Sequence, residues 1–591
     1  MSSEDNGSNV ANVRNRPTHR ACDICHRRKR DGLEPCGTCI QREFKCTYEQ
    51  GARATGISSS YVQCLENRLE TVEMLLRDAT IRAEGIDAAP ASTPRNGPAV
   101  EIITLGLRSL NRPFPAPHKD DVGLLGENMG SLSLNSPGSH VFQGKSSSAM
   151  FVKAAVDLKG SRPSNQPRNI KPWEFVTPRP NYDFPEDDLA IALISLYFDN
   201  INIFFSLLHR PTFESAFAAT LHLRNDGFGG TLLLVCALGA LYSDDPRVHP
   251  AAVPSGSPAG WRWFSQAVLV GHQLSSQPTL YDLQSYCLTT QFLERTSSPR
   301  ASWTLVGIGM RLAQDIGAHR EKLRTRMITP EEELEKRAYW VMFLFDTQLS
   351  AALGRSIAIQ MHDVNLASPV RCDDQYWAAS LCNAEFCQPP NTPSVVDFFA
   401  SFLKLNDILH FALKFLYSTN RMSTTLATDD ELWQEKLVME FDSALNKWFD
   451  SVPAHLRWDP ACPSDMFLDQ SAALHCSYYF MRILVHRPFI PAIQSSDTPS
   501  PYPSLSICNT AARACIHVAE IQHRRRPNNP LVFGQTAVFT AGIVLLLNMW
   551  GSNRTGRVPD TDLLAVHRCI DVLRAHKIRW PSTGPLLYRL V

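Results

Sequence analysis

Five cysteines lie within twenty-five residues near the start of the chain, at Cys22, Cys25, Cys36, Cys39 and Cys46. Four of them form two C-x-x-C pairs that are separated by ten residues. A C-x-x-C pair places two thiolates on one turn, where both reach the same tetrahedral zinc ion. A redox pair would lie between a strand and a helix, whereas basic or polar sequence follows each pair here. The spacing therefore predicts a metal-binding module.

The cysteine segment is also basic. From Ala11 to Cys46 there are nine Lys or Arg and four Asp or Glu, in a chain that has 58 residues of each sign. Local positive charge on a small module is typical of contact with a nucleic acid. The run 26–30 by itself would indicate a solvated charge run or a nuclear-import signal. Between two C-x-x-C pairs it favours DNA contact, which is compatible with nuclear import.

The segment resembles the DNA-binding domain of fungal binuclear zinc-cluster transcription factors, a family in which six cysteines hold two zinc ions. The resemblance implies zinc as the cofactor and DNA as a partner. A module this small buries little core, so metal binding would supply its folding free energy. The matching residues are Cys22, Asp23, Cys25, Arg28, Lys29, Asp31, Gly32, Pro35, Cys36, Cys39, Cys46 and Tyr48.

The sequence departs from the family in one place. The family has a further cysteine directly before the Asp31-Gly32 pair, and here it is absent, with the interval from Cys25 to Cys36 two residues short. In the family the first and fourth cysteines bridge both metals, which implies that Cys22 and Cys36 do so here.

The resemblance then gives the second metal a full set of four ligands, Cys22, Cys36, Cys39 and Cys46. The first metal keeps Cys22, Cys25 and Cys36, one short of the closed set that a structural zinc requires. Three explanations are open. The first is that the gene model has lost two codons, and we favour this explanation because the sequence on both sides matches the family. The second is that Asp31 or His26 supplies the missing ligand. The third is that the first metal site is empty.

The resemblance also implies how DNA is read. The segment after the second cysteine forms a short helix in the major groove at a CGG-type triplet. Lys and Arg donate to guanine O6 and N7, and by position Arg28 and Lys29 are the candidates for these base contacts. Arg27, Arg30 and Arg42 are the candidates for phosphate contacts, which position the protein without specifying sequence.

A helix is predicted at 61–78, directly after this module. Its apolar residues are spaced three and four apart, as in a coiled coil, at Val62, Leu65, Leu69, Val72 and Leu76. Only about two heptads are present, so an amphipathic helix docked on its own chain is the alternative. The position after a DNA-binding module favours a homodimer that reads two half-sites, with their spacing set by the linker.

Composition divides the chain into six parts. The predicted fold is a small zinc-stabilised N-terminal module with a short coiled coil, a flexible linker and a large all-α regulatory domain. The parts are a disordered 1–19, the zinc cluster 20–48, a linker 49–60, the coiled coil 61–78, a disordered linker 79–180 and the all-α domain 181–591. Residues 1–17 contain no apolar stretch, so we expect no secretory signal and a reducing compartment.

Apolar periodicity predicts the helices of the large domain. One helix has Trp303, Val306, Met310, Ala313 and Gly317 on one face, and the next has Leu334, Ala338, Val341, Phe345, Leu349 and Ala352. A third has Leu474, Tyr478, Met481 and Val485, and we expect it to end at Pro488. The apolar stretch 531–550 is interrupted by polar residues, which favours a buried helix over a membrane span.

The segments 193–213, 302–321, 335–369 and 477–490 resemble the fungal-specific transcription factor domain, or middle homology region. The resemblance implies a nuclear regulator of RNA polymerase II genes that meets the transcription machinery and controls secondary metabolism or nutrient use. The alternative is a regulator with a degenerate cluster that does not bind DNA. No enzyme motif is found. We expect helix-end hydrogen bonds at His209 and His486, and a structural pair of Asp346 with Arg355.

Overall fold

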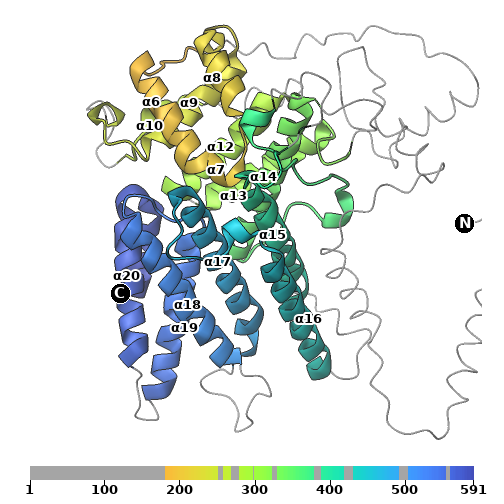
Figure 1. The fold of residues 1–591 in the computed structure, drawn as a ribbon, viewed down its shortest axis with the longest axis vertical. Coiled ribbons are helices and arrows are strands. Elements are labelled where there is room, and N and C mark those ends of the chain that lie inside the picture. The colour runs from red at the N-terminus through yellow and green to blue at the C-terminus, as the bar shows by residue number, and fades with distance from the viewer. Residues whose placement is uncertain are drawn as a thin grey trace, which may run out of the picture. The chain divides into compact units, whose positions relative to one another are not determined.

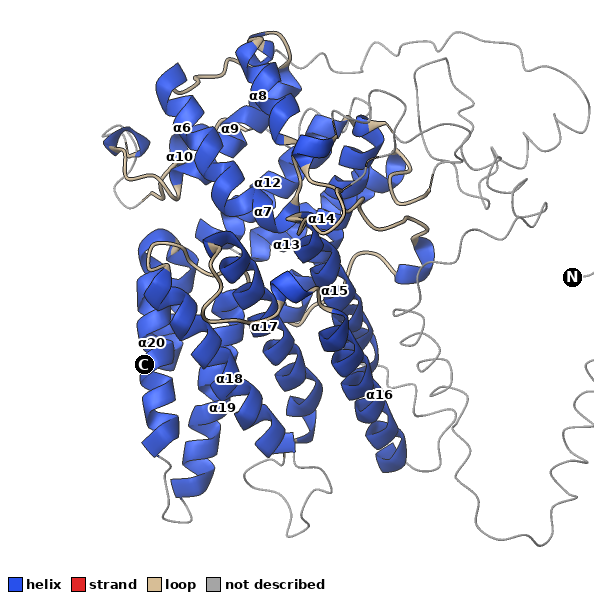
Figure 2. Cartoon of the chain, viewed as in Figure 1, coloured by secondary structure: helices blue, strands red, loops and turns tan. Residues whose placement is uncertain are grey.

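The computed structural model describes the regulatory part of the chain. The described residues are 180–249, 257–267, 278–296, 299–321, 329–377, 386, 388–417, 430–490, 504–553 and 560–591. In these ranges the secondary structure is helical, with one isolated bridge between Arg320 and Asn365 and no strand (Figure 2). The chain divides into two units at Arg95 and Asn96, and every described residue belongs to the second. The predicted all-α domain is thus confirmed within these ranges.

The described helices vary from single turns to a helix of 24 residues. In chain order they are α6 (Asp187–Tyr197), the π-helix η1 (Phe198–Asn202), α7 (Ile203–Phe205), α8 (Arg210–Ala218), α9 (Asp226–Ala240), α10 (Trp261–Phe264), α12 (Leu280–Thr296), α13 (Pro299–Asp315), α14 (Pro330–Leu353), α15 (Val396–Leu416), α16 (Asp430–Ser451), α17 (Asp465–His486), α18 (Ser504–Arg525), α19 (Gly534–Asn553), α20 (Asp560–Arg579) and α21 (Gly584–Leu590). Short 3-10 turns join them at η2 (Leu221–Leu223), η3 (Pro246–Val248), η4 (Met361–Asp363), η5 (Asp374–Tyr376), η8 (Ala454–Leu456), η9 (Arg487–Phe489) and η10 (Pro581–Thr583).

The helices pack in two groups around one continuous apolar core. In the first group α9 packs on α6 and α12, and α13 packs on α12 and α14. In the second, α17 to α20 lie side by side in chain order (Figure 1). Helix α15 contacts α14 of the first group and α17 of the second, so it joins the two. The core therefore runs through the whole described domain, and no second core of comparable size separates from it.

Three predicted helices are confirmed as α13, α14 and α17, with two corrections. Gly317 is not on the α13 face, because α13 ends at Asp315 and Gly317 has a positive φ of 79°. The Ala318 N–H donates to the Ala313 carbonyl and the Gly317 N–H to the Gln314 carbonyl, which is a Schellman termination. Ala352 lies within α14 but is exposed, because the last turn of α14 leaves the core.

The ends of these helices follow their sequence signals. Helix α14 begins with a capping box of Thr329 and Glu332 around Pro330, and it ends at Gly354 in the left-handed conformation. Helix α17 ends at His486, just before Pro488, as predicted.

Two apolar segments can be compared with a membrane-spanning helix in length and composition. The stretch 531–550 forms most of α19, which buries Val538, Ala541 and Leu545, so the predicted buried helix is confirmed. By length and composition alone, Asp187–Phe205 is able to cross a bilayer. More than half of this segment is buried inside the domain, as is typical of a core helix.

Candidate functional site

The residues predicted to bind zinc and DNA and to form the dimer lie outside the described residues. This holds for the five cysteines and the substitute ligands Asp31 and His26, for the basic residues from Arg27 to Arg42, and for the coiled-coil positions from Val62 to Leu76. These assignments therefore stay predictions. The described domain shows how the segments that resemble the fungal-specific transcription factor domain contact one another.

The cysteines of the described domain are thiols, most of them buried. Seven of the eight are buried, and none of the eight forms a disulfide with another described cysteine. Desolvation raises the pKa of Cys236 and Cys287, and it raises that of Cys508 to about 12, so these groups stay protonated at neutral pH. Among the described residues, no group of three or more His, Cys, Asp or Glu is arranged to hold a metal ion.

His209 caps the start of α8. Its Nδ1 lies 2.6 Å from Thr212 Oγ1 and 3.4 Å from the Thr212 backbone nitrogen, while Nε2 lies 3.1 Å from the Asp374 carbonyl oxygen. The imidazole stacks on the Trp377 ring with centroids 4.4 Å apart. Both ring nitrogens thus have structural partners, and the predicted helix-end hydrogen bond is confirmed.

Arg337 of α14 contacts the same tryptophan. The guanidinium is fully buried and sits 4.5 Å from the Trp377 ring centroid. It donates to the Ser206 carbonyl at 3.1 Å and to the Cys372 carbonyl at 3.4 Å, and pairs with Glu333 Oε1 at 3.4 Å. A buried arginine needs such a set of acceptors, because an unpaired buried charge is strongly destabilising.

The partners of Arg337 are themselves fixed. Glu333 also pairs with Lys336 at 2.7 Å and accepts from the Val370 N–H at 2.8 Å. Asp374 pairs with Arg337 through Oδ1 at 3.5 Å, and its Oδ2 accepts from the Arg210 N–H at 2.9 Å. This buried polar group, the Arg337 network, therefore ties the family-like segments 193–213 and 335–369 to each other. It lies in the core and holds the domain together.

His486 closes α17 in a similar way. Its Nε2 lies 3.1 Å from Asp442 Oδ1 on α16, and its Nδ1 lies 3.5 Å from Ser504 Oγ at the start of α18. The ring is buried and bridges three helices. The predicted helix-end hydrogen bond is confirmed here too, and the contacts are structural.

The predicted pair of Asp346 with Arg355 is wrong. Asp346 is buried and accepts a hydrogen bond from the Ala358 N–H at 2.7 Å. Arg355 lies instead over the Trp303 ring, 4.6 Å from its centroid. The left-handed Gly354 turns the chain at the end of α14 and brings the Ala358 backbone N–H to the Asp346 carboxylate. This N–H supplies the hydrogen bond that was expected from the Arg355 side chain.

Comparison with known proteins places both parts of the chain. Residues 20–55 match the family model of the fungal Zn(2)-Cys(6) binuclear cluster domain. Residues 194–450 match that of the fungal specific transcription factor domain. The second match includes α8, α14 and the Arg337 network. No solved structure gives a significant match.

Curated relatives agree with these matches. The chain is 25% identical over 509 residues to an uncharacterised transcriptional regulatory protein of Schizosaccharomyces pombe, covering 81% of this chain and 63% of the relative. It is 23% identical to the transcriptional activator protein acu-15 of Neurospora crassa, covering 91% and 58%. It is 24% identical to an ABC-transporter-regulating transcription factor of Aspergillus fumigatus, covering 86% and 65%.

The alignments thus span about three fifths of the length of these relatives. The family descriptions and the relatives' names denote transcription factors and no enzyme. The chain thus carries both a fungal Zn(2)-Cys(6) binuclear cluster domain and a fungal specific transcription factor domain, and its relatives are named as fungal transcriptional regulators.

Proposed function

We propose that this protein is a sequence-specific DNA-binding regulator of RNA polymerase II genes that acts in the nucleus as a homodimer on CGG-type half-sites. The observation that carries the proposal is the pairing of a zinc-cluster match at 20–55 with a helical regulatory domain match at 194–450. The first supplies the basic DNA-binding module. The second supplies the domain that meets the transcription machinery.

Base recognition falls to two residues of the module. Arg28 and Lys29 donate to guanine O6 and N7, and each good base contact is worth about 1–3 kcal/mol of discrimination. Arg27, Arg30 and Arg42 neutralise phosphates, so they add affinity that falls with salt and carries no sequence information. The helix at 61–78 pairs two copies through Val62, Leu65, Leu69, Val72 and Leu76.

Zinc would hold the module in shape. Four thiolates, Cys22, Cys36, Cys39 and Cys46, are the chemistry of a closed structural site. The other site has three thiolates, Cys22, Cys25 and Cys36, so it fits zinc only with Asp31 or His26 as a fourth ligand, or with codons restored by the transcript. Sequencing the transcript across codons 25–36 tests the last alternative.

The test of DNA binding is a gel-shift titration of the full chain with zinc, on duplexes that contain paired CGG triplets or a scrambled sequence. We expect tighter binding to the CGG duplex. Lys29→Ala should abolish this preference while salt-sensitive binding remains, whereas Arg42→Ala should weaken binding to both duplexes alike. Unchanged preference in Lys29→Ala would refute the assignment of the base contact.

The absent sixth cysteine favours one second candidate. In this second candidate function the zinc cluster does not bind DNA, and the protein regulates through dimerisation or by sequestering a partner. Failure to shift either duplex at low salt, with zinc present and the chain folded, would support this candidate.

The relatives' names describe an activator and a regulator of ABC transporters. For this protein we propose genes of nutrient use or secondary metabolism as the controlled set.

A further inference from the structure

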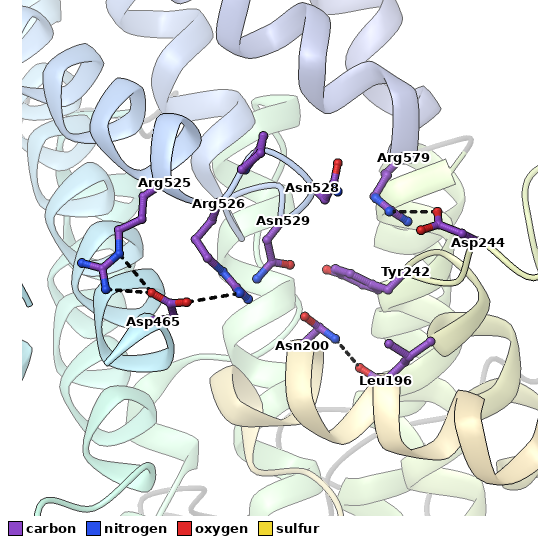
Figure 3. A pocket seen from close by; sticks show the side chains of 11 residues that line it. Leu196, Asn200, Tyr242, Asp244, Asp465, Arg525, Arg526, Asn528, Asn529 and Arg579 are labelled. Carbon is purple, nitrogen blue, oxygen red and sulfur yellow. Dashed lines mark hydrogen bonds and ion pairs between the residues drawn. The ribbon is translucent and has the colours of Figure 1, made fainter. Parts of the chain in front are cut away.

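A polar cavity of about 380 Å³ lies where the last turns of α18 and α20 meet the first turn of α17 and the end of α9 (Figure 3). Three arginines line it, Arg525 at the end of α18, Arg526 in the following loop and Arg579 at the end of α20. The volume lies within the range of small-molecule sites. These three guanidinium groups outnumber the two carboxylates in the lining, Asp244 and Asp465, which favours an anionic occupant.

The arginines differ in how much of their hydrogen-bonding capacity the protein uses. Arg525 is held by two bonds to Asp465 Oδ1, at 3.0 Å from Nε and 2.8 Å from NH2. Among the described residues, the Arg526 side chain has two longer contacts, 3.3 Å to Asp469 Oδ2 and 3.6 Å to Asp465 Oδ2. Asp465 is thus already satisfied by Arg525. A guanidinium has five N–H donors, so Arg526 retains donors for another acceptor.

Arg579 approaches the cavity from the opposite side (Figure 3). It donates to the Leu241 carbonyl at 3.2 Å and pairs with Asp244 at 3.2 Å. The Asp244 side chain is 89% exposed, so solvent screens this pair and it contributes little. A ligand anion that reaches Arg579 therefore competes with a weak partner.

Tyr242 supplies an independent sign of a ligand. Only 8% of its surface is exposed, and its hydroxyl has no hydrogen-bond partner among the described residues. Its hydroxyl end points into the cavity between Arg526 and Arg579 (Figure 3). Leaving a buried hydroxyl unpaired costs about 1–3 kcal/mol, so this group is suited to a ligand oxygen.

The charges around Tyr242 also favour an anion. Desolvation raises the pKa of Tyr242 to about 12, so its hydroxyl stays protonated and able to donate at neutral pH. Arg295 opposes that shift, by its positive charge and by the contact of its side chain with the hydroxyl, whereas the Asp469 carboxylate adds to it. Arg295 is fully buried over the Trp580 ring, 5.1 Å from its centroid, and lies 3.7 Å from the Glu294 carboxylate.

We propose that this cavity binds a small organic oxyanion, a dicarboxylate or a phosphate ester, held by Arg526 and Arg579 from two sides and by the Tyr242 hydroxyl between them. The site joins distant parts of the chain, because Asp244 and Arg579 are 335 residues apart and Arg579 lies beyond the family match that ends at 450. A bound anion would thus fix the C-terminal helices against the end of α9. This inference does not depend on DNA binding.

The test measures the unfolding midpoint of the full chain with sodium succinate or sodium phosphate as the probe. Sodium chloride at equal ionic strength and the neutral dimethyl succinate are the controls. Specific binding to the folded state raises the midpoint with probe concentration. A rise with succinate assigns the site to carboxylates, and a rise with phosphate assigns it to phosphate groups. No rise beyond sodium chloride with either probe would overturn the proposal.

Variants locate the binding. Arg579→Gln and Tyr242→Phe should each raise the dissociation constant of the active probe at least tenfold, whereas Arg574→Gln, on the exposed face of the same helix, should leave it unchanged. Tyr242→Phe removes an unpaired hydroxyl, so we expect it to fold at least as stably as the wild type. Equal probe affinity in Tyr242→Phe and Arg574→Gln would show only an adventitious anion effect and reject the site.

Discussion

Arg337 and His209 both contact one indole ring, that of Trp377. The guanidinium is 4.5 Å from the ring centroid and the imidazole 4.4 Å, and the imidazole is nearly parallel to the indole, at 15°. The three residues come from α14, the start of α8 and the turn after η5. The buried Arg337 guanidinium thus connects these three parts of the chain.

Removing that charge should destabilise the domain strongly. Arg337→Ala removes the donor of the Ser206 carbonyl and leaves the Cys372 carbonyl only the Trp377 indole N–H, and we expect a loss of about 3–5 kcal/mol in the free energy of unfolding. Arg337→Lys should recover only part of the lost stability, because an ammonium group cannot donate in all the directions in which the planar guanidinium donates. Urea titration of the full chain measures this, with the exposed Arg311→Ala as the control, expected within about 0.5 kcal/mol of the wild type. Wild-type stability in Arg337→Ala would contradict a structural role.

Close packing of α6 on α9 gives a second prediction. A Cβ at Gly239 would overlap the carbonyl oxygen of Leu193, a backbone atom that cannot rotate away. Gly239→Ala should therefore lower the free energy of unfolding by about 1–3 kcal/mol or more. The matched control is Gly307→Ala in α13, where a Cβ meets nothing within 4 Å. That change should stabilise the helix by up to about 1 kcal/mol, and equal effects of the two changes would contradict the packing.

Periodicity predicted the helix faces because burial repeats along each helix every three or four residues. Val306, Met310 and Ala313 are buried as expected. The same reasoning failed at Gly317, where a left-handed glycine ends α13. The His209 cap was predictable as well, since Pro211 and Thr212 follow it as helix-start residues.

Partners in the core could not be predicted in this way. Arg337 meets Ser206, which lies 131 residues earlier, and no local pattern encodes that distance. The cavity presents the same problem. The run 524–526 is visibly basic, but only the fold brings two of its arginines to Arg579 and Tyr242. A buried hydroxyl without a partner is recognisable only once its surroundings are known.

A third prediction concerns the pH dependence of stability. Burial raises the pKa of Asp346 to about 6, from an ordinary value of 3.8, although the Ala358 N–H opposes the shift. The folded state therefore binds this proton more tightly than the unfolded chain. The contribution of Asp346 to stability is greatest below about pH 4 and falls as the pH rises to about 6, by an amount on the order of 3 kcal/mol.

Asp346→Asn should remove that decline. The comparison is the urea midpoint of the full chain between pH 4 and pH 7 for the wild type, Asp346→Asn and the exposed Asp450→Asn. Other buried carboxyls, such as Asp407, also have a raised pKa, so only the difference between wild type and variant reports on Asp346. Parallel pH curves for the wild type and Asp346→Asn would show that this carboxyl does not titrate as proposed.

The zinc content gives the final prediction. Five thiolates complete only one closed set of four, so we expect the purified full chain to hold about one zinc ion by elemental analysis, fewer than the two of the family. Cys39→Ser should remove that ion, because Cys39 belongs to the complete set. Cys25→Ser should retain it, because Cys25 belongs to the incomplete one. The helical circular dichroism should survive a chelator in all three chains, since the described domain contains no metal-ligand group. Two zinc ions in the wild type would instead require a sixth ligand, and their reduction to one in Asp31→Asn or in His26→Ala would identify it.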